Sequence, residues 1–164
     1  MFTLRNYSPA DFETLYEIDQ ACYEPAIAYS RSELRAYLRF PGADCVVAET
    51  TGRKPSIAGF CITAREDDWS YIITIDVLAA HRRGGVGSLL LTEAERRLAE
   101  RGVSEIALDT AVNNAAAIAF WQKHGYRIRG TRKGYYPGRI DAYAMSKALP
   151  APKSTPAKSR AAKT

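Results

Sequence analysis

Residues 71–91 read YIITIDVLAAHRRGGVGSLLL, and this stretch indicates the fold class more clearly than any other part of the chain. Its first half is a run of β-branched, aromatic and aliphatic residues, which is typical of a buried strand. Three glycines follow within four positions, at Gly84, Gly85 and Gly87. An apolar helical stripe begins directly after them and ends before Gly102, a residue typical of a helix C-terminus. We therefore predict a strand, a tight glycine turn and a long helix in immediate succession.

The sequence on either side of this unit alternates between strand-like and helix-like segments. Paired strands come first and a strand–helix–strand order follows, which favours an α/β (α+β) fold with helices covering a mixed sheet. Ser30 followed by Glu33 is typical of a capping box, and Asn113 or Asn114 is a typical helix N-cap. We expect about six or seven strands, near 2–7, 45–49, 57–64, 69–78, 106–109, 126–131 and 140–146, and about four helices, beginning near residues 9, 30, 86 and 114.

Length and composition exclude several classes of protein. The chain has 164 residues, the length of one ordinary domain. Its 46% of apolar and 25% of charged residues are close to the globular average, which excludes a fibrous or largely disordered chain. No apolar run approaches the roughly 20 residues that cross a bilayer, and residues 1–5 do not resemble a secretory signal. We expect a cytoplasmic protein without membrane contact, either a monomer or a weak dimer.

Cysteine and histidine usage argues against a disulfide framework and against a metal centre. Cys22, Cys45 and Cys61 are far apart in the sequence and form no C-x-x-C pair. We expect free, buried thiols, as in proteins of a reducing compartment. His81 and His124 are the only histidines, and neither belongs to a cluster with the spacing of metal ligands. We therefore expect structural or solvent-facing histidines and no metal.

The net charge of +5 is concentrated at the C-terminal end of the sequence. Residues 150–164 contain four basic residues and no acidic one, so the chain without those four carries 19 basic and 18 acidic residues. A segment rich in Pro, Ala, Ser and Lys buries too little surface to offset the entropy of ordering. We predict one domain over residues 1–149 and a disordered tail over 150–164. We favour a solubilising tail over one that binds nucleic acid.

The glycine turn after the predicted strand is suited to binding an anion. Consecutive glycines let main-chain N–H groups approach a ligand that a Cβ atom would keep away. The unpaired N–H groups in the first turn of the following helix add a partial positive charge, and Arg82 and Arg83 add full charges nearby. Residues 82–88 are therefore candidates for binding a pyrophosphate.

The glycine pattern differs from two other types of phosphate loop. A Walker A loop requires a lysine after its last glycine, and none follows Gly87. A dinucleotide-binding fingerprint requires a third glycine where this sequence has Leu90, although Asp109 lies about 20 residues further on. A turn that only starts a helix, without binding a ligand, remains a further alternative.

The spacing Arg82-x-x-Gly85-x-Gly87 resembles the acetyl-CoA pyrophosphate signature of the GNAT family of N-acetyltransferases. Residues 113–118, NNAAAI, and the pair Gly125-Tyr126 are similar to a second cofactor segment of that family. The resemblance covers residues 1–149. Residues 108–122, followed by 133–137 (KGYYP), are most similar to the enzymes that acetylate protein N-termini, including those that modify a ribosomal protein.

This resemblance implies a fold and a mode of binding acetyl-CoA. A mixed sheet would open between its fourth and fifth strands, which end near Leu78 and Asp109, and the cofactor would lie in the opening. Main-chain groups of the fourth strand would pair with the pantetheine arm, and the glycine turn would hold the pyrophosphate. The residues implied in cofactor binding are Ile75, Asp76, Val77, Arg82, Arg83, Gly84, Gly85, Val86, Gly87, Ser88 and Asn114. For Asn114, the role of a plain N-cap is an equal alternative.

The resemblance also implies two catalytic residues and one departure from the family pattern. Asp109 stands where relatives place a catalytic glutamate or histidine, and Tyr71 matches a tyrosine that works with that histidine. We predict that Asp109 accepts the amine proton through water and that Tyr71 assists by a hydrogen bond. Relatives carry a tyrosine as general acid where this sequence has Trp121, so we predict no general acid, although Tyr126 and Tyr135 are alternatives. A structural role for Asp109 or Tyr71 also stays open.

Four residues are candidates for binding the acceptor. Tyr29, in an early loop, and Tyr135 and Tyr136, in a late loop, resemble residues that hold a substrate's N-terminal residues, and Glu24 could attract the ammonium group. The function favoured by the resemblance is direct acetylation of the α-amino group of a peptide or protein, such as a ribosomal protein. The alternatives are acetylation of a small amine or a lysine side chain, a non-catalytic acyl-CoA sensor, and a nucleic-acid-binding module that rests on the tail alone.

Overall fold

A mixed sheet runs through the centre of the computed structural model, which describes residues 1–150. Within these residues the sheet has seven strands in the order β1-β2-β3-β4-β5-β7-β6. The predicted tail from residue 151 onward lies outside the described residues. The strands are β1 (Phe2–Asn6), β2 (Ala43–Thr50), β3 (Ile57–Glu66), β4 (Trp69–Val77), β5 (Glu105–Ala111), β6 (Arg127–Tyr136) and β7 (Ile140–Ala148). The helices are α1 (Phe12–Cys22), α2 (Arg31–Arg39), α3 (Val86–Glu100) and α4 (Ala115–Lys123), with 3-10 turns η1 (Pro9–Asp11) and η2 (Ala79–His81).

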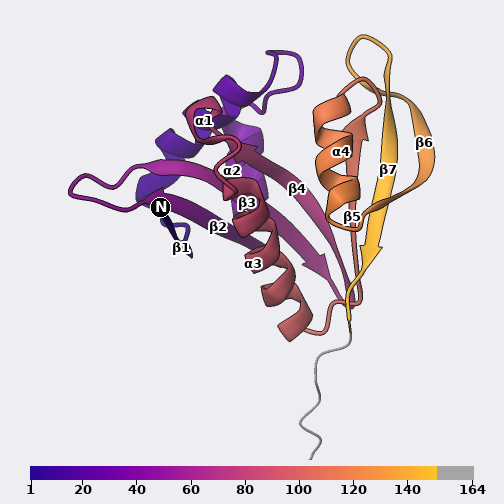
Figure 1. The fold of residues 1–164 in the computed structure, drawn as a ribbon. Coiled ribbons are helices and arrows are strands. Elements are labelled where there is room, and N and C mark those ends of the chain that lie inside the picture. Colours follow the sequence, from indigo (N-terminus) through magenta and orange to yellow (C-terminus); the bar gives the residue numbers. More distant parts are fainter. Residues whose placement is uncertain (151–164) are drawn as a thin grey trace, which may run out of the picture.

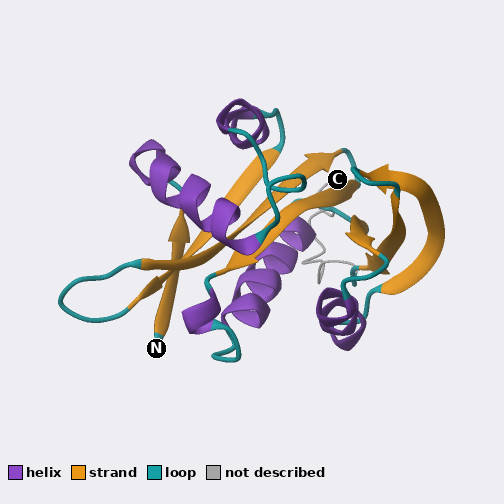
Figure 2. Ribbon diagram, turned by 90° about the horizontal axis from the view of Figure 1, so that it is seen from above, coloured by secondary structure: helices purple, strands orange, loops and turns teal. Residues whose placement is uncertain are grey.

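Helices cover both faces of the sheet, and each face has its own apolar core (Figure 2). On one face, α3 and α4 pack on the sheet through Leu90, Leu98 and Trp121. On the other face, α1 and α2 pack through Leu15 and Leu34. Burial of this apolar surface on two sides is the principal stabilising contribution to a three-layer domain of this kind.

Strands β4 and β5 pair at one end only, and this feature positions the candidate site. They are parallel, and their pairing is limited to Trp69 with Glu105, Ser70 with Ile106, and Tyr71 with Ala107. Beyond these pairs the two strands diverge, so that the sheet opens into a V with α3 along one arm and α4 along the other (Figure 1). The predicted opening between the fourth and fifth strands is confirmed.

A β-bulge in β4 lies where this opening begins. Ile62 of β3 pairs with Thr74, but the next residue of β3, Thr63, pairs with Ile72, so Ile73 has no partner. A bulge of one residue reverses the faces to which the following side chains point. Ile73 joins the core under α1 and α2, and the side chains of Ile75 and Val77 contact the core under α3.

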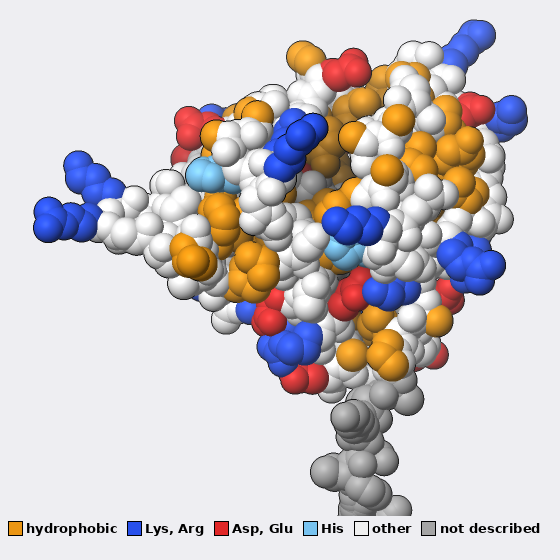
Figure 3. All heavy atoms as spheres, in the orientation of Figure 1, with side chains coloured by type: hydrophobic (Ala, Val, Ile, Leu, Met, Phe, Trp, Pro, Cys, Tyr) orange, Lys and Arg blue, Asp and Glu red, His pale blue; other side chains and the backbone are white. Residues whose placement is uncertain are grey.

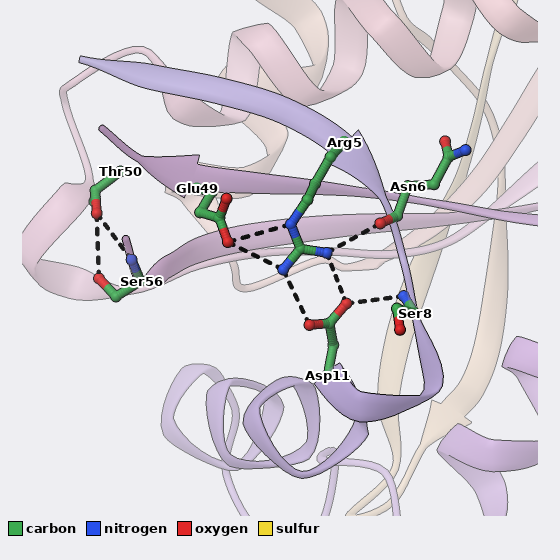
Figure 4. A network of polar contacts seen from close by, with 7 residues as sticks. All are labelled: Arg5, Asn6, Ser8, Asp11, Glu49, Thr50 and Ser56. Carbon is green, nitrogen blue, oxygen red and sulfur yellow. Dashed lines mark hydrogen bonds and ion pairs between the residues drawn. The ribbon is translucent and has the colours of Figure 1, made fainter. Parts of the chain in front are cut away.

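The first strand is tied to the rest of the sheet by a polar network around Arg5 (Figure 4). The guanidinium group of Arg5 donates both to the carboxylate of Asp11 in η1, at 2.8 and 3.0 Å, and to that of Glu49 in β2, at 3.1 and 3.2 Å. The carboxylate of Asp11 also accepts the N–H of Ser8 at 2.8 Å. Bidentate pairing of this kind fixes the chain's path from β1 into α1.

The local sequence signals for helix ends are largely confirmed. Ser30 and Glu33 form the predicted capping box, Asn114 caps α4, and Gly102 follows α3 with φ +83°. Several boundaries differ from the prediction, and β2, β3, β5 and β7 each extend one or two residues beyond the predicted strands. The helix predicted to open at residue 9 begins as the 3-10 turn η1, and the Tyr135–Tyr136 pair belongs to the end of β6 rather than to a loop. Hydrogen bonding across to β7 extends β6 beyond its apolar part.

The three cysteines are free, as predicted, and Cys45 and Cys61 are buried. Burial raises the pKa of all three thiols above the ordinary value. No helix within residues 1–150 combines the length and the apolar character needed to cross a membrane.

The close approach of β3 to β4 gives a test of the sheet arrangement. A Cβ atom on Gly59 would overlap the carbonyl oxygen of Asp76, whereas one on Gly130 would meet no atom within 4 Å. We expect Gly59→Ala to lower the free energy of unfolding by about 1–3 kcal/mol, because the strands must separate. Gly130→Ala, the matched control on β6, should change it by less than about 0.5 kcal/mol. Urea unfolding of both variants is the measurement, and equal stability of the two would contradict the close contact between Gly59 and β4.

Candidate active site

The turn that follows β4 exposes main-chain N–H groups at the start of α3. Arg83 and Gly85 both have left-handed backbones, with φ +70° and +81°. Gly85 is the N-cap of α3 and supplies no side-chain acceptor, and the first turn contains no acidic residue. The first N–H groups of an α-helix have no partner within the helix. This turn therefore has the geometry and the partial charge of an anion site.

Glycine is required at positions 85 and 87 for different structural reasons. A Cβ atom on Gly85 would meet nothing within 4 Å, so only its backbone conformation requires glycine. A Cβ atom on Gly87 would lie 3.2 Å from the ring of Phe120, so Gly87 lets α4 approach α3. The hydroxyl of Ser88 is paired with Nε2 of His124 at 2.9 Å, which leaves the main-chain N–H as the group of Ser88 available to a ligand. His124 thus has a structural role.

A cleft of about 440 Å³ occupies the opening between β4 and β5. This volume is within the range of small-molecule sites. Figure 3 shows the surface hollowed between the two arms of the V, with hydrophobic side chains inside and Lys or Arg side chains at its edge. Its lining residues on β4 and β5 are Tyr71, Ile72, Ile73, Thr74, Ile75, Asp109, Thr110 and Ala111. Its remaining lining residues are Asp19, Tyr23, Ile27, Tyr29, Glu33, Tyr37, Asn114, Ala117, Trp121, Tyr135, Tyr136 and Pro137.

The main chain of β4 is only partly as predicted for pairing with a ligand. The carbonyl oxygen of Asp76 is turned toward Gly59 of β3, so its main chain belongs to the β3 ladder and not to the cleft. The carbonyl oxygen of Val77 instead accepts from Nε of Arg82 at 3.0 Å and from Sγ of Cys22 at 3.5 Å. The main chain of Asp76 is therefore not free to pair with a ligand in the cleft, whereas pairing through Ile75 and Val77 stays a prediction. In this structure Arg82 therefore stabilises the end of β4 by its hydrogen bond to Val77.

The carboxylate of Asp109 lies at the end of β5 with two donors. The hydroxyl of Tyr71 donates to Oδ2, and Nε of Arg132 donates to Oδ1 at 2.8 Å. The hydroxyl of Tyr136 donates to the main-chain oxygen of Asp109 at 3.2 Å. The side chain of Asp109 is only 4% exposed although it lines the cleft. Burial and the neighbouring carboxylate raise the pKa of Tyr71, so its phenol keeps its proton and acts as a donor.

The three predicted acceptor tyrosines all line the cleft, whereas Glu24 does not. The hydroxyl of Tyr29 donates to the carbonyl oxygen of Ile73 at 3.1 Å, so the bulge of β4 holds this ring. The rings of Tyr135 and Tyr136 meet edge to face, with centroids 4.9 Å apart. Burial raises the pKa of Tyr136 to about 12. Glu24 is exposed on the α1–α2 connection, where its main-chain oxygen accepts the N–H groups of Ile27 and Ala28, and its contact with the ammonium group stays a prediction.

The residues considered for a general acid are placed apart from one another. Trp121 is 6% exposed, lies in the core under α4 and forms part of the cleft wall. Tyr126 is buried, and its hydroxyl donates to Glu95 at 2.8 Å, so it faces α3 and not the cleft. Tyr135 is half-exposed in the cleft wall. Asn114 lines the cleft, and its Oδ1 accepts the N–H of Ala117 at 3.1 Å, so its side chain serves as the N-cap.

Sequence reasoning missed several residues of this site. Arg132 comes from β6, which is separated from β5 in the sheet by β7, and no local pattern signals its contact with Asp109. Tyr23 and Tyr37 reach the cleft from the C-cap of α1 and from α2, where the sequence indicates only a loop residue and a helix aromatic. A second hollow of about 220 Å³ shares the walls Tyr37, Tyr71 and Ile73 with the cleft; its other lining residues are Phe40, Ala64, Glu66 and Trp69.

The sheet opens beside the glycine-capped helix α3, and the carboxylate of Asp109 lies on the facing strand, so the cleft leaves room for a ligand between the two strands. Residues 12–126 match the family model described as the acetyltransferase (GNAT) family. The chain belongs to this family of acetyl-CoA-dependent N-acetyltransferases.

Individual relatives agree with this assignment. The chain is 30% identical over 154 residues to the [ribosomal protein bS18]-alanine N-acetyltransferase of Escherichia coli K12, covering 89% of this chain and 97% of that protein. The crystal structure of the E. coli ribosomal-protein-S18-alanine N-acetyltransferase superposes with a TM-score of 0.82 at 27% identity, covering 93% of this chain and 97% of that one. Ard1 from Thermoplasma volcanium gives 0.81 at 26% identity, covering 91% and 98%.

A pair of glycines separates the effect on ligand binding from the effect on folding. Gly85 and Gly102 have nearly equal φ values, +81° and +83°, and a Cβ atom on either would meet no neighbour. Alanine at either position should therefore cost about 1 kcal/mol of stability, from backbone strain alone. Only Gly85→Ala should weaken acetyl-CoA binding, by about tenfold, because it alters the N–H groups at the start of α3. Calorimetric titration checks this, and equal affinities of the two variants would argue against a pyrophosphate site at this turn.

Proposed function

We propose that this chain transfers the acetyl group of acetyl-CoA directly to the α-amino group at the N-terminus of a peptide or protein. The observation that carries this proposal is the position of the Asp109 carboxylate, held by Tyr71 and Arg132 inside a cleft that several tyrosines line. Tyrosine rings at the mouth of a site offer apolar surface and a polar hydroxyl together, which suits a peptide main chain. The similarity to a ribosomal-protein-alanine N-acetyltransferase supports the same class of acceptor.

The residues of the cleft fit a direct transfer. Acetyl-CoA, when bound, supplies the acetyl thioester. The lone pair of the neutral amine forms the new C–N bond, the C–S bond breaks, and the thiolate leaves with a proton from water. Asp109 takes the proton that the amine loses, through a water molecule, while Tyr71 and Arg132 hold its two oxygens in place. An α-amine with a pKa near 8 is already partly neutral at pH 7, so a carboxylate base is sufficient for this step.

The cysteines do not fit an acyl-enzyme route. Burial raises the pKa of Cys45 and Cys61, and neither lines the cleft. A cysteine nucleophile requires a lowered pKa or an adjacent base. Cys22 also has a raised pKa, and its thiol faces the carbonyl oxygen of Val77. The proposal is therefore a single transfer step without a covalent enzyme intermediate, in which a main-chain N–H near Val77 would polarise the thioester carbonyl.

The acceptor class can be tested with matched peptides. The purified chain would be incubated with acetyl-CoA and with two peptides that contain one internal lysine and differ only in whether the α-amine is free or blocked. We expect mass spectrometry to place one acetyl group on the first residue of the free peptide and none on the blocked one. Acetylation of the lysine in both peptides, or equal rates with free polyamines, would favour the other acceptor classes. Binding of acetyl-CoA without transfer to any amine would indicate an acyl-CoA sensor.

The role of Asp109 gives a second kinetic prediction. Asp109→Asn keeps the size of the side chain but removes the proton acceptor. We expect kcat to fall by about a hundredfold to ten-thousandfold while the Kd for acetyl-CoA changes little. Asp68→Asn, which removes the same charge from an exposed turn, is the control and should keep full activity. Stopped assays over a range of peptide concentrations separate kcat from KM, and wild-type kcat in Asp109→Asn would exclude Asp109 as the base.

A further inference from the structure

Two buried carboxyl groups lie beside the cleft without any basic partner. Asp19 of α1 is 0% exposed and Asp76 of β4 is 1% exposed. Among the described residues, the ion pairs include no Lys or Arg paired with either group. An isolated buried carboxylate is costly, and two that face each other without compensation are more so. These residues are therefore unexplained by apolar packing or by salt bridges.

Each carboxyl group has one oxygen in a hydrogen bond and one without a donor. Oδ2 of Asp19 accepts the main-chain N–H of Tyr29 at 2.7 Å, and Oδ1 of Asp76 accepts the hydroxyl of Thr74. The remaining atoms, Oδ1 of Asp19 and Oδ2 of Asp76, are buried and accept from no N–H or O–H group of the described chain. The two carboxyl groups also interact, since each contributes to the pKa shift of the other. Buried acceptor oxygens without a donor are costly, and one proton held between the two groups would supply the missing donor.

We propose that Asp19 and Asp76 share one proton. By joining α1 to β4, this proton positions the side of the cleft that we propose to bind the peptide substrate. The main-chain N–H of Tyr29 donates to one end of the pair, and the Tyr29 hydroxyl reaches the carbonyl of Ile73 at the bulge. Thr74 is bound at the other end, and its hydroxyl contacts that of Tyr23 at 3.3 Å. Tyr23, Tyr29 and Thr74 all line the cleft. The pair is a positioning device and does not itself touch the reacting atoms.

The surroundings of the pair favour retention of this proton. Desolvation, together with the charge of the partner carboxyl, raises the pKa of Asp76, and desolvation raises that of Asp19. The thiols and phenols nearby have raised pKa values of their own and stay neutral, so they add no compensating charge. The titratable groups that interact with the pair are Cys22 of α1, Tyr23 after α1, Tyr29 before α2, Glu33 of α2, Cys45 of β2 and Cys61 of β3. The guanidinium group of Arg82 is directed to the carbonyl oxygen of Val77.

Linkage gives the sign of the pH dependence. At a pH above the ordinary carboxyl range, the folded chain binds the shared proton and the unfolded chain does not. Stability therefore falls as pH rises, until the folded pair loses its proton. Asp76→Asn removes this dependence without leaving a gap. Its amide N–H donates to Asp19 and its amide oxygen accepts from Thr74, so the variant has the charge of the singly protonated pair.

The first experiment measures unfolding and does not need a substrate. Urea unfolding of the wild type, Asp76→Asn, Asp19→Asn and the control Asp68→Asn is followed from about pH 5 to pH 9. We divide the unfolding constant of the wild type by that of either Asn variant of the pair, and we expect this ratio to rise by up to about tenfold per pH unit. The unfolding free energy of Asp68→Asn should follow the same pH dependence as that of the wild type. Other groups that titrate in this range are common to all four chains and cancel in the ratio. Parallel curves for the wild type and both pair variants would overturn the proposal.

The positioning role is tested by kinetics and rests on the proposed function. With a peptide that the wild type acetylates, KM for the peptide should rise at the pH at which the unfolding data show the pair losing its proton. In Asp76→Asn this rise should be absent, while the pH profile of kcat follows that of the wild type. An identical KM profile in both chains would refute the positioning role. If no amine is acetylated, the proposed function fails, and the unfolding experiment still decides whether the proton is shared.

Discussion

The interaction on which the rest of this structure depends is the short ladder between β4 and β5. Three residue pairs hold the two parallel strands together, and beyond Tyr71 and Ala107 the ladder stops. Main-chain N–H and C=O groups within a sheet normally find partners, because an unpaired buried group costs about as much as a lost hydrogen bond. Where the strands diverge, these groups face a cleft. A ligand with its own amides can complete the ladder there, as an added strand would.

Different groups lie on the two sides of the opening between β4 and β5. On the α3 side, the ring of Phe120 packs over Gly87, and Ser88 is hydrogen-bonded to His124, which joins α3 to α4 across the opening. On the opposite side, the tyrosines of the α1–α2 region and of the β6–β7 end line the cleft. The glycine turn before α3 and the carboxylate of Asp109 therefore belong to different arms of the V, and the contacts between α3 and α4 connect these arms.

Local sequence signals predicted the helices and strands of this fold, whereas contacts between distant segments determine strand register and the direction of the β4 side chains. Ser30 with Glu33, Asn114 and Gly102 are signals that act within one helical turn, and each is found where the sequence places it. The bulge at Ile73 has no such signal, because it arises from register with β3. It sets the faces of β4 so that Thr74 and Asp76 point to α1, and this explains how a polar Asp occupies an apolar strand. The aspartate within residues 73–77 (ITIDV) is the sign in the sequence that this strand faces a polar group of a neighbouring element, here Asp19 of α1.

Two kinds of aspartate at the same cleft show how environment divides the roles of one residue type. Asp109 faces a guanidinium group and a phenol, so each of its two carboxyl oxygens accepts from a donor. Asp19 and Asp76 meet no cation among the described residues, and the charge of one disfavours the charge of the other. The environment of each carboxyl group, and not the residue type, decides which partners it meets. Arg132 accounts for this difference, because its side chain extends from β6 past β7 and pairs with Asp109 on β5. Within residues 1–150, no basic residue forms such an ion pair with Asp76.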